Sequence, residues 1–104
     1  MVKVEVCIKA DHISRITITG HADSAPNGQD LVCAGVSSIG VGILNALDEL
    51  CTDMCILKMN DSHIYIEVKT DNETVQTILK TLYVQLKTMA ESYEKYIEIM
   101  KVEV

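Results

Sequence analysis

The chain has 104 residues, the size of one domain, and we expect a single domain over residues 1–104. Its formal net charge is −6, and Lys and Arg form no cluster, which disfavours direct binding to nucleic acid because that requires a basic surface. No apolar run approaches the roughly 20 residues of a membrane span, and charged residues interrupt the N-terminal segment where a secretion signal would be apolar. These features predict a cytoplasmic protein without nucleic-acid or membrane contacts.

The N-terminal region alternates between apolar and polar residues, which is the period of a half-buried strand. The alternation runs over residues 2–9 and again over 13–19, where Ile16 and Ile18 share the inner face. Asp11 and His12 separate the two segments. The pattern predicts an antiparallel hairpin with an exposed turn at His12.

Gly20 ends the second predicted strand, and a polar loop follows His21. The loop is dense in turn-forming residues. It consists of Ala22, Asp23, Ser24, Ala25, Pro26, Asn27, Gly28 and Gln29. Its length and polarity indicate a mobile segment that could gate access of a substrate to a site beneath it.

An apolar helix is predicted from Leu31 to about Cys51, with Asp30 as its N-cap. The helix contains Gly35, Gly40 and Gly42, each of which costs about 1 kcal/mol of helix propensity relative to Ala. We expect these glycines to allow close approach of another backbone, from the sheet or from a second subunit.

The second half repeats the layout of the first. Strands are predicted over residues 54–59 and 63–69, and a capping box with Thr70 or Asp71 as N-cap starts a helix that runs to about Ser92. Its apolar stripe leaves Gln76 on the outer face, and residues 97–104 could add a last strand. The order ββαββα, with a possible final strand, predicts an α+β two-layer sandwich, in which an antiparallel sheet of four to five strands carries two helices on one face.

Cys33 occupies the third position of the predicted helix, where unpaired backbone N–H groups and the helix dipole favour a thiolate. His21 lies at the other end of the loop and could supply an acid–base group. Metal binding by Cys51 and Cys55 is disfavoured, because their spacing is not the usual C-x2-C and no fourth ligand is evident beyond His63. We expect no metal, no organic cofactor and no disulfide.

The loop and its flanks resemble the ribosomal-processing cysteine proteases, a bacterial family whose pattern is G-H-A followed by G-x-D-I-V-C-A-A-V-S. The corresponding residues are Gly20-His21-Ala22 and Gly28-Gln29-Asp30-Leu31-Val32-Cys33-Ala34-Gly35-Val36-Ser37. The resemblance implies a cysteine endopeptidase with a Cys33–His21 dyad. It also implies that the substrate is the N-terminal extension of a large-subunit ribosomal protein, that its removal supports ribosome assembly, and that the enzyme is a homodimer.

The roles of two further residues stay open from the sequence. Asp30 is either only a helix cap or a carboxylate that orients His21, and Ser37 either supports the site or bonds back to the helix backbone. A non-catalytic module that binds an extended peptide is the alternative function, and a redox-sensing thiol protein is a weaker one.

Overall fold

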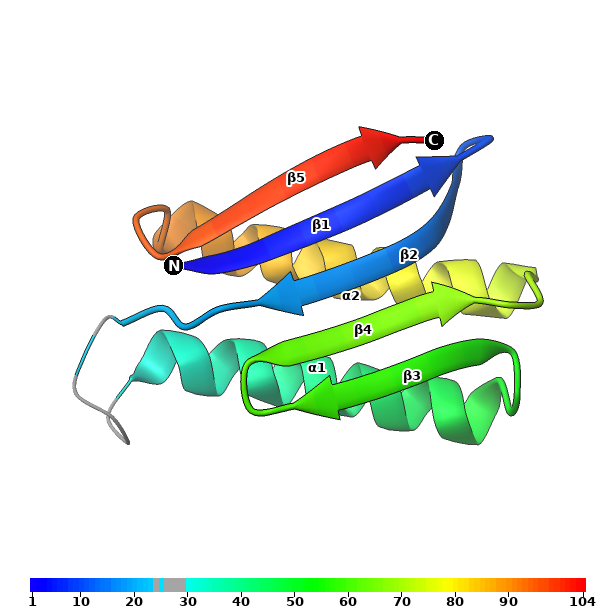
Figure 1. The fold of residues 1–104 in the computed structure, drawn as a ribbon, viewed down its shortest axis with the longest axis horizontal. Helices are drawn as coiled ribbons and strands as arrows, with labels where there is room; N and C mark the ends of the chain where they lie inside the picture. Colours follow the sequence, from blue (N-terminus) through cyan, green and yellow to red (C-terminus); the bar gives the residue numbers. More distant parts are fainter. Residues whose placement is uncertain (24, 26–29) are drawn as a thin grey trace.

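The computed structural model describes residues 1–23, 25 and 30–104, which form a sheet backed by two helices (Figure 1). The elements are β1 (Val2–Lys9), β2 (His12–Thr19), α1 (Leu31–Leu50), β3 (Cys55–Asn60), β4 (His63–Val68), α2 (Glu73–Ser92) and β5 (Ile97–Glu103). The predicted α+β class, the order of elements and the final strand are confirmed.

The strand order in the sheet is β3-β4-β2-β1-β5. The first four strands pair antiparallel as predicted, whereas β5 pairs parallel with β1. The reason is the α2 crossover, which returns the chain to the end of the sheet where β4 began, so that β5 runs in the direction of β4 and β1 (Figure 1).

The core lies between the helices and the inner face of the sheet. Its largest fully buried side chains are Ile16, Leu47, Ile66, Leu79, Leu82, Leu86, Val2, Val4, Val6 and Val75. Cys7 is equally buried but lies on the outer face of the sheet, as the alternation predicts. There the guanidinium of Arg15 donates a hydrogen bond to its sulfur at 3.0 Å.

The start of α2 differs from the prediction. Its N-cap is Asn72, whose side chain accepts a hydrogen bond from Val75 N–H at 2.8 Å, and not Thr70 or Asp71. Gln76, predicted to face outward, is 6% exposed and bonds both the N–H and the C=O of Ile13 at 2.8 Å. A polar side chain is buried here because it satisfies the backbone at the start of β2.

His12 also differs from the prediction of an exposed turn residue. Ala10 and Asp11 take the positive-φ positions of the β1–β2 turn, so His12 already belongs to β2. Its Nδ1 lies 2.6 Å from a carboxylate oxygen of Asp71, whose other oxygen accepts from Gln76. Burial opposes the charge on Asp71, but these two hydrogen bonds lower its pKa overall.

The α1 glycines do not meet another backbone within the described chain. A Cβ at Gly35 would lie 2.7 Å from the Met89 side chain, and a Cβ at Gly40 would lie 2.4 Å from Ile64 Cδ1. At Gly42 a Cβ would meet no described atom within 4 Å. The expected backbone approach is therefore wrong at Gly35 and Gly40, where side chains occupy the space.

Helix α1 is apolar enough to cross a membrane by length and composition alone, with a mean hydropathy of 1.6 over an 18-residue window. Core helices of soluble proteins pass the same test. Here Val32, Val36, Ile43 and Leu47 of α1 are buried in the core, although only 28% of the window is buried.

Candidate active site

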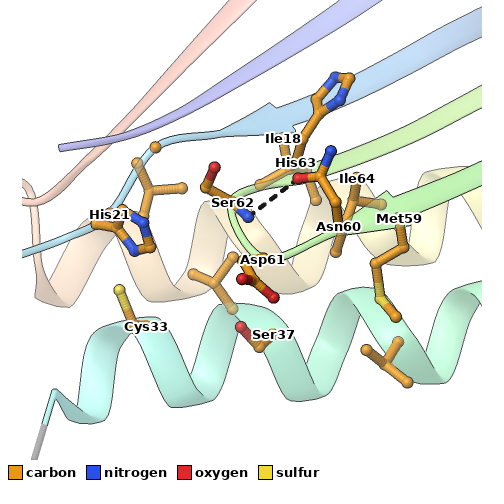
Figure 2. Close-up of a pocket in the computed structure, with 14 residues that line it drawn as sticks. Ile18, His21, Cys33, Ser37, Met59, Asn60, Asp61, Ser62, His63 and Ile64 are labelled. Atoms are coloured by element: carbon orange, nitrogen blue, oxygen red, sulfur yellow. Dashed lines mark hydrogen bonds between the residues drawn. The ribbon is translucent and has the colours of Figure 1, made fainter. Parts of the chain in front are cut away.

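His21 lies two residues after the end of β2, and two backbone contacts hold the intervening Gly20 in place. Gly20 has φ +88°, donates its N–H to the carbonyl of Ser62 at 3.0 Å, and lies so close to Met1 that a Cβ would be 2.5 Å from the Met1 carbonyl oxygen. Only glycine fits both the backbone angle and the available space. The tight turn carries the exposed side chain of His21 over the first turn of α1 (Figure 2).

Cys33 lies in the first turn of α1, as predicted. Its backbone N–H donates to Asp30 Oδ1 at 3.0 Å, which confirms Asp30 as the N-cap of this helix. Its sulfur accepts a hydrogen bond from the backbone N–H of Ala22 at 3.1 Å. Figure 2 shows the Cys33 side chain rising from α1 toward the His21 ring.

Two clefts meet at these side chains. One has a volume of about 180 Å³ and extends between α1 and the β3–β4 turn; the other, of about 530 Å³, is bounded by the start of α1 and by Asp23 and Ala25 of the loop. His21, Cys33 and Ser37 line both clefts. A peptide that runs from one cleft into the other would therefore pass directly over the Cys33 sulfur.

The first cleft has apolar side chains in its lining and a polar rim. Val36, Val41, Met59 and Ile64 contribute the apolar side chains. The rim is the β3–β4 turn, from which Asp61 projects into the space above Ser37 in Figure 2. An amphipathic groove of this kind can bind an extended peptide through its side chains and its backbone.

The sequence had indicated the β3–β4 turn only as a connection. Asn60, Asp61 and Ser62 line the first cleft, and so does Val2 at the start of the chain. No motif marks these residues, because their place depends on the pairing of β4 with β2. His63 also lines this cleft, but its ring points away from Cys33 (Figure 2).

The remaining predicted site residues fall into two groups. Ser37 lies one turn after Cys33 and is exposed, as a residue in contact with substrate would be. Ser24 and residues 26–29 lie outside the described residues, so gating by this loop stays a prediction.

The other cysteines do not join the site. Cys51 caps the far end of α1. Burial, and after it the negative charge of the Cys51 side chain in its thiolate form, raises the pKa of Cys55. Among the residues described by the structure, no three His, Cys, Asp or Glu side chains are grouped so as to hold a metal ion.

Comparison with known proteins identifies the family of the chain. The family model described as cysteine protease Prp matches residues 1–98. The ribosomal processing cysteine protease Prp of Staphylococcus aureus is 32% identical over 103 residues, covering 95% of this chain and 97% of that protein. The protein of the same name from Bacillus subtilis is 27% identical over 106 residues, covering 92% and 95%.

Solved structures agree with these matches. The S. aureus ribosomal processing protease Prp in complex with a covalently linked product peptide superposes with a TM-score of 0.90 at 31% identity, covering 97% of this chain and 99% of that one. SMU.848 from Streptococcus mutans, at 22% identity and a TM-score of 0.83, shares the fold. By its sequence and its fold, this chain belongs to the cysteine protease Prp family.

Proposed function

We propose that this protein is a cysteine endopeptidase that removes the N-terminal extension of a large-subunit ribosomal protein, with Cys33 as nucleophile and His21 as its acid–base partner. The observation that carries the proposal is the meeting of two clefts at His21 and Cys33. The relatives are named as ribosomal processing proteases, and the S. aureus protein has been solved with a substrate peptide and with a covalently linked product peptide. We extend their activity to this chain.

The two side chains can divide the reaction as in other thiol proteases. His21 takes the proton of the Cys33 thiol, and the resulting thiolate attacks the scissile carbonyl carbon, whose π pair moves onto oxygen. When the C=O bond reforms, the C–N bond breaks and the imidazolium of His21 protonates the departing amine. Water then attacks the thioester and gives its proton to His21, and the thiolate leaves.

Asp30 and Ser37 support this chemistry in different ways. Asp30 holds the first turn of α1 through Cys33 N–H, so we assign it to helix structure and not to the orientation of His21. Ser37 lines both clefts and is placed to hydrogen-bond the peptide where it crosses from one to the other. The proposal needs no metal and no cofactor.

We also propose that the enzyme is a homodimer in the cytoplasm. Only 28% of the apolar α1 window is buried in one protomer, and Leu31 and Leu50 are 77% and 69% exposed, so a second subunit could cover part of this helix. All four cysteines are free, and a reducing compartment would keep them in this state. The mass in solution, measured by light scattering, tests the dimer.

The activity is tested by mass spectrometry of the ribosomal protein with its extension after incubation with wild type, Cys33→Ala or His21→Ala. Cys55→Ala serves as the matched control for loss of a thiol. We expect one defined N-terminal fragment with wild type and the control only. Cleavage by Cys33→Ala would disprove the nucleophile, whereas binding without cleavage by any of the proteins would favour a peptide-binding module.

A further inference from the structure

The backbone N–H of Cys33 is already engaged in the resting enzyme. In serine and cysteine hydrolases the N–H of the nucleophile itself is a common donor to the oxyanion of the tetrahedral intermediate. Here that N–H donates to Asp30 Oδ1 at 3.0 Å. A carboxylate at this point would also repel a negative oxygen, so the structure calls for an oxyanion donor elsewhere.

A different N–H group points at the sulfur. Ala22 N–H lies 3.1 Å from Cys33 Sγ, although the two residues are 11 positions apart. Ala22 is 3% exposed and belongs to the hydrophobic core, and Gly20, two residues earlier, is held to Ser62 by a backbone hydrogen bond. The amide is therefore fixed before substrate arrives, which is what electrostatic stabilisation of a transition state requires.

We propose that the backbone amide of Ala22 is an oxyanion donor of this protease, an inference that rests on the proposed function. As Cys33 Sγ bonds to the scissile carbon, the π pair of the carbonyl becomes a lone pair on an oxygen next to the sulfur. The Ala22 N–H then transfers its hydrogen bond from sulfur, which loses its negative charge, to that oxygen, which gains it. The hydrogen bond returns to the sulfur when hydrolysis of the thioester regenerates the thiolate.

The arrangement links the two catalytic side chains. Ala22 directly follows His21, so one short segment presents both the group that protonates the leaving amine and the group that stabilises the oxyanion. Residues 20–22 are anchored at Gly20 by the β3–β4 turn. The β3–β4 turn is thus a positioning element for catalysis as well as a wall of the first cleft.

The test replaces the Ala22 amide by an ester, using L-lactic acid in place of Ala22 in a chemically synthesised chain. Native chemical ligation at the chain's own cysteines makes such a synthesis practical. The matched control carries the same replacement at Ala10, an exposed residue of the β1–β2 turn at the other end of the sheet. Circular dichroism verifies folding, and two rates are measured on each protein.

The first rate is kcat for a peptide that spans the cleavage site, and the second is alkylation of Cys33 by iodoacetamide, a reaction without an oxyanion. We expect the Ala22 ester to lower kcat by about 10²–10³-fold with little change in KM. Alkylation should fall by no more than about tenfold, because loss of a hydrogen bond to the thiolate lowers the fraction of thiolate but raises the nucleophilicity of the thiolate that remains. Equal losses in both rates, or no loss, would overturn the proposal. Inactivity of the unmodified synthetic chain would instead contradict the proposed function.

A second measurement uses the unmodified enzyme and does not depend on the folding of the ester variant. A substrate-derived peptide aldehyde adds the Cys33 S–H across its carbonyl, so that a C–S bond forms and the hemithioacetal oxygen takes the position of the oxyanion. With ¹⁵N-labelled protein we expect a large downfield shift of the Ala22 amide proton on adduct formation, compared with a small change at Ala10. An unchanged Ala22 resonance in the adduct would refute the assignment.

Discussion

Substitutions at Asp30 can distinguish its role as a helix cap from a role in catalysis. Its carboxylate accepts the Cys33 N–H at 3.0 Å as the N-cap of α1. Asp30→Ala removes this bond, for which N-cap data give a loss of about 1 kcal/mol. For a domain of this size that corresponds to a fall in melting temperature of about 4–8 °C. Asp30→Asn keeps a capping oxygen, and we expect its melting temperature to stay within about 2 °C of wild type.

The Asp30→Asn variant also tests whether Asp30 takes part in catalysis, because it keeps the helix cap and removes the charge. Asn lacks the negative charge close to the sulfur, which in a solvated site changes the energy of a thiolate by about 1 kcal/mol. Alkylation of Cys33 should therefore be as fast in Asp30→Asn as in wild type, or a few times faster. We expect kcat/KM to change by no more than about the same factor, since we assign this carboxylate to the helix cap and not to the orientation of His21.

The assays are thermal unfolding followed by circular dichroism, kcat/KM on a peptide spanning the cleavage site, and the alkylation rate of Cys33. In a Ser-His-Asp triad, Asn in place of the orienting Asp costs about 10⁴ in kcat. A loss of two or more orders of magnitude in Asp30→Asn, at unchanged melting temperature, would refute our reading of Asp30. Equal melting temperatures for wild type and Asp30→Ala would show that the cap does not stabilise the helix.

Three further predictions concern the scaffold. Gly42→Ala should raise the free energy of unfolding by about 1 kcal/mol in thermal melts, because the added Cβ would meet no described atom within 4 Å. Gly40→Ala should show no such gain, since its Cβ would lie 2.4 Å from Ile64 Cδ1. A lower free energy of unfolding for Gly42→Ala would show that another surface packs against this position. Gln76→Leu leaves the N–H and C=O of Ile13 without their partner and should cost about 2–5 kcal/mol in urea unfolding, so a loss below about 1 kcal/mol would contradict the burial argument. The pKa of Asp71 is lowered below its ordinary 3.8, so its stabilising effect is complete above about pH 4 and is lost as pH falls through the folded pKa. Wild type should therefore lose more stability than Asp71→Asn between pH 5 and 2, and parallel curves would rule this out.

Local patterns were sufficient for most of the elements. Alternation of apolar residues identifies β1, β2 and β4, because a strand that is half buried must alternate. Asp30 identifies the start of α1, because the unpaired N–H groups of a first turn need an acceptor from the preceding residue. Cys33 in that first turn, with His21 at the other end of the loop, is likewise visible in the sequence once the family pattern is recognised.

Tertiary contacts decided the features that local patterns missed. Gln76 reads as a surface residue of an amphipathic helix, and it is buried only because α2 begins against the backbone of Ile13. Asn72 caps α2 in place of Asp71, since the Asp71 carboxylate bonds His12 across 59 positions of sequence. Periodicity indicates which face of an element is buried, but it does not indicate which distant residue will meet that face.

The active site itself depends on the strand order. Because β4 pairs with β2 in the register Ile18↔Ile64 and Thr19↔His63, the β3–β4 turn lies beside the strand end that carries His21. The same pairing brings Ser62 to Gly20 and completes the cleft over Cys33. By itself the sequence predicted the two candidate catalytic side chains and the helix that holds one of them. Only the pairing of strands far apart in the chain determined the walls of the cleft, because hydrogen bonding between strands depends on their neighbours in space and not on their order in sequence.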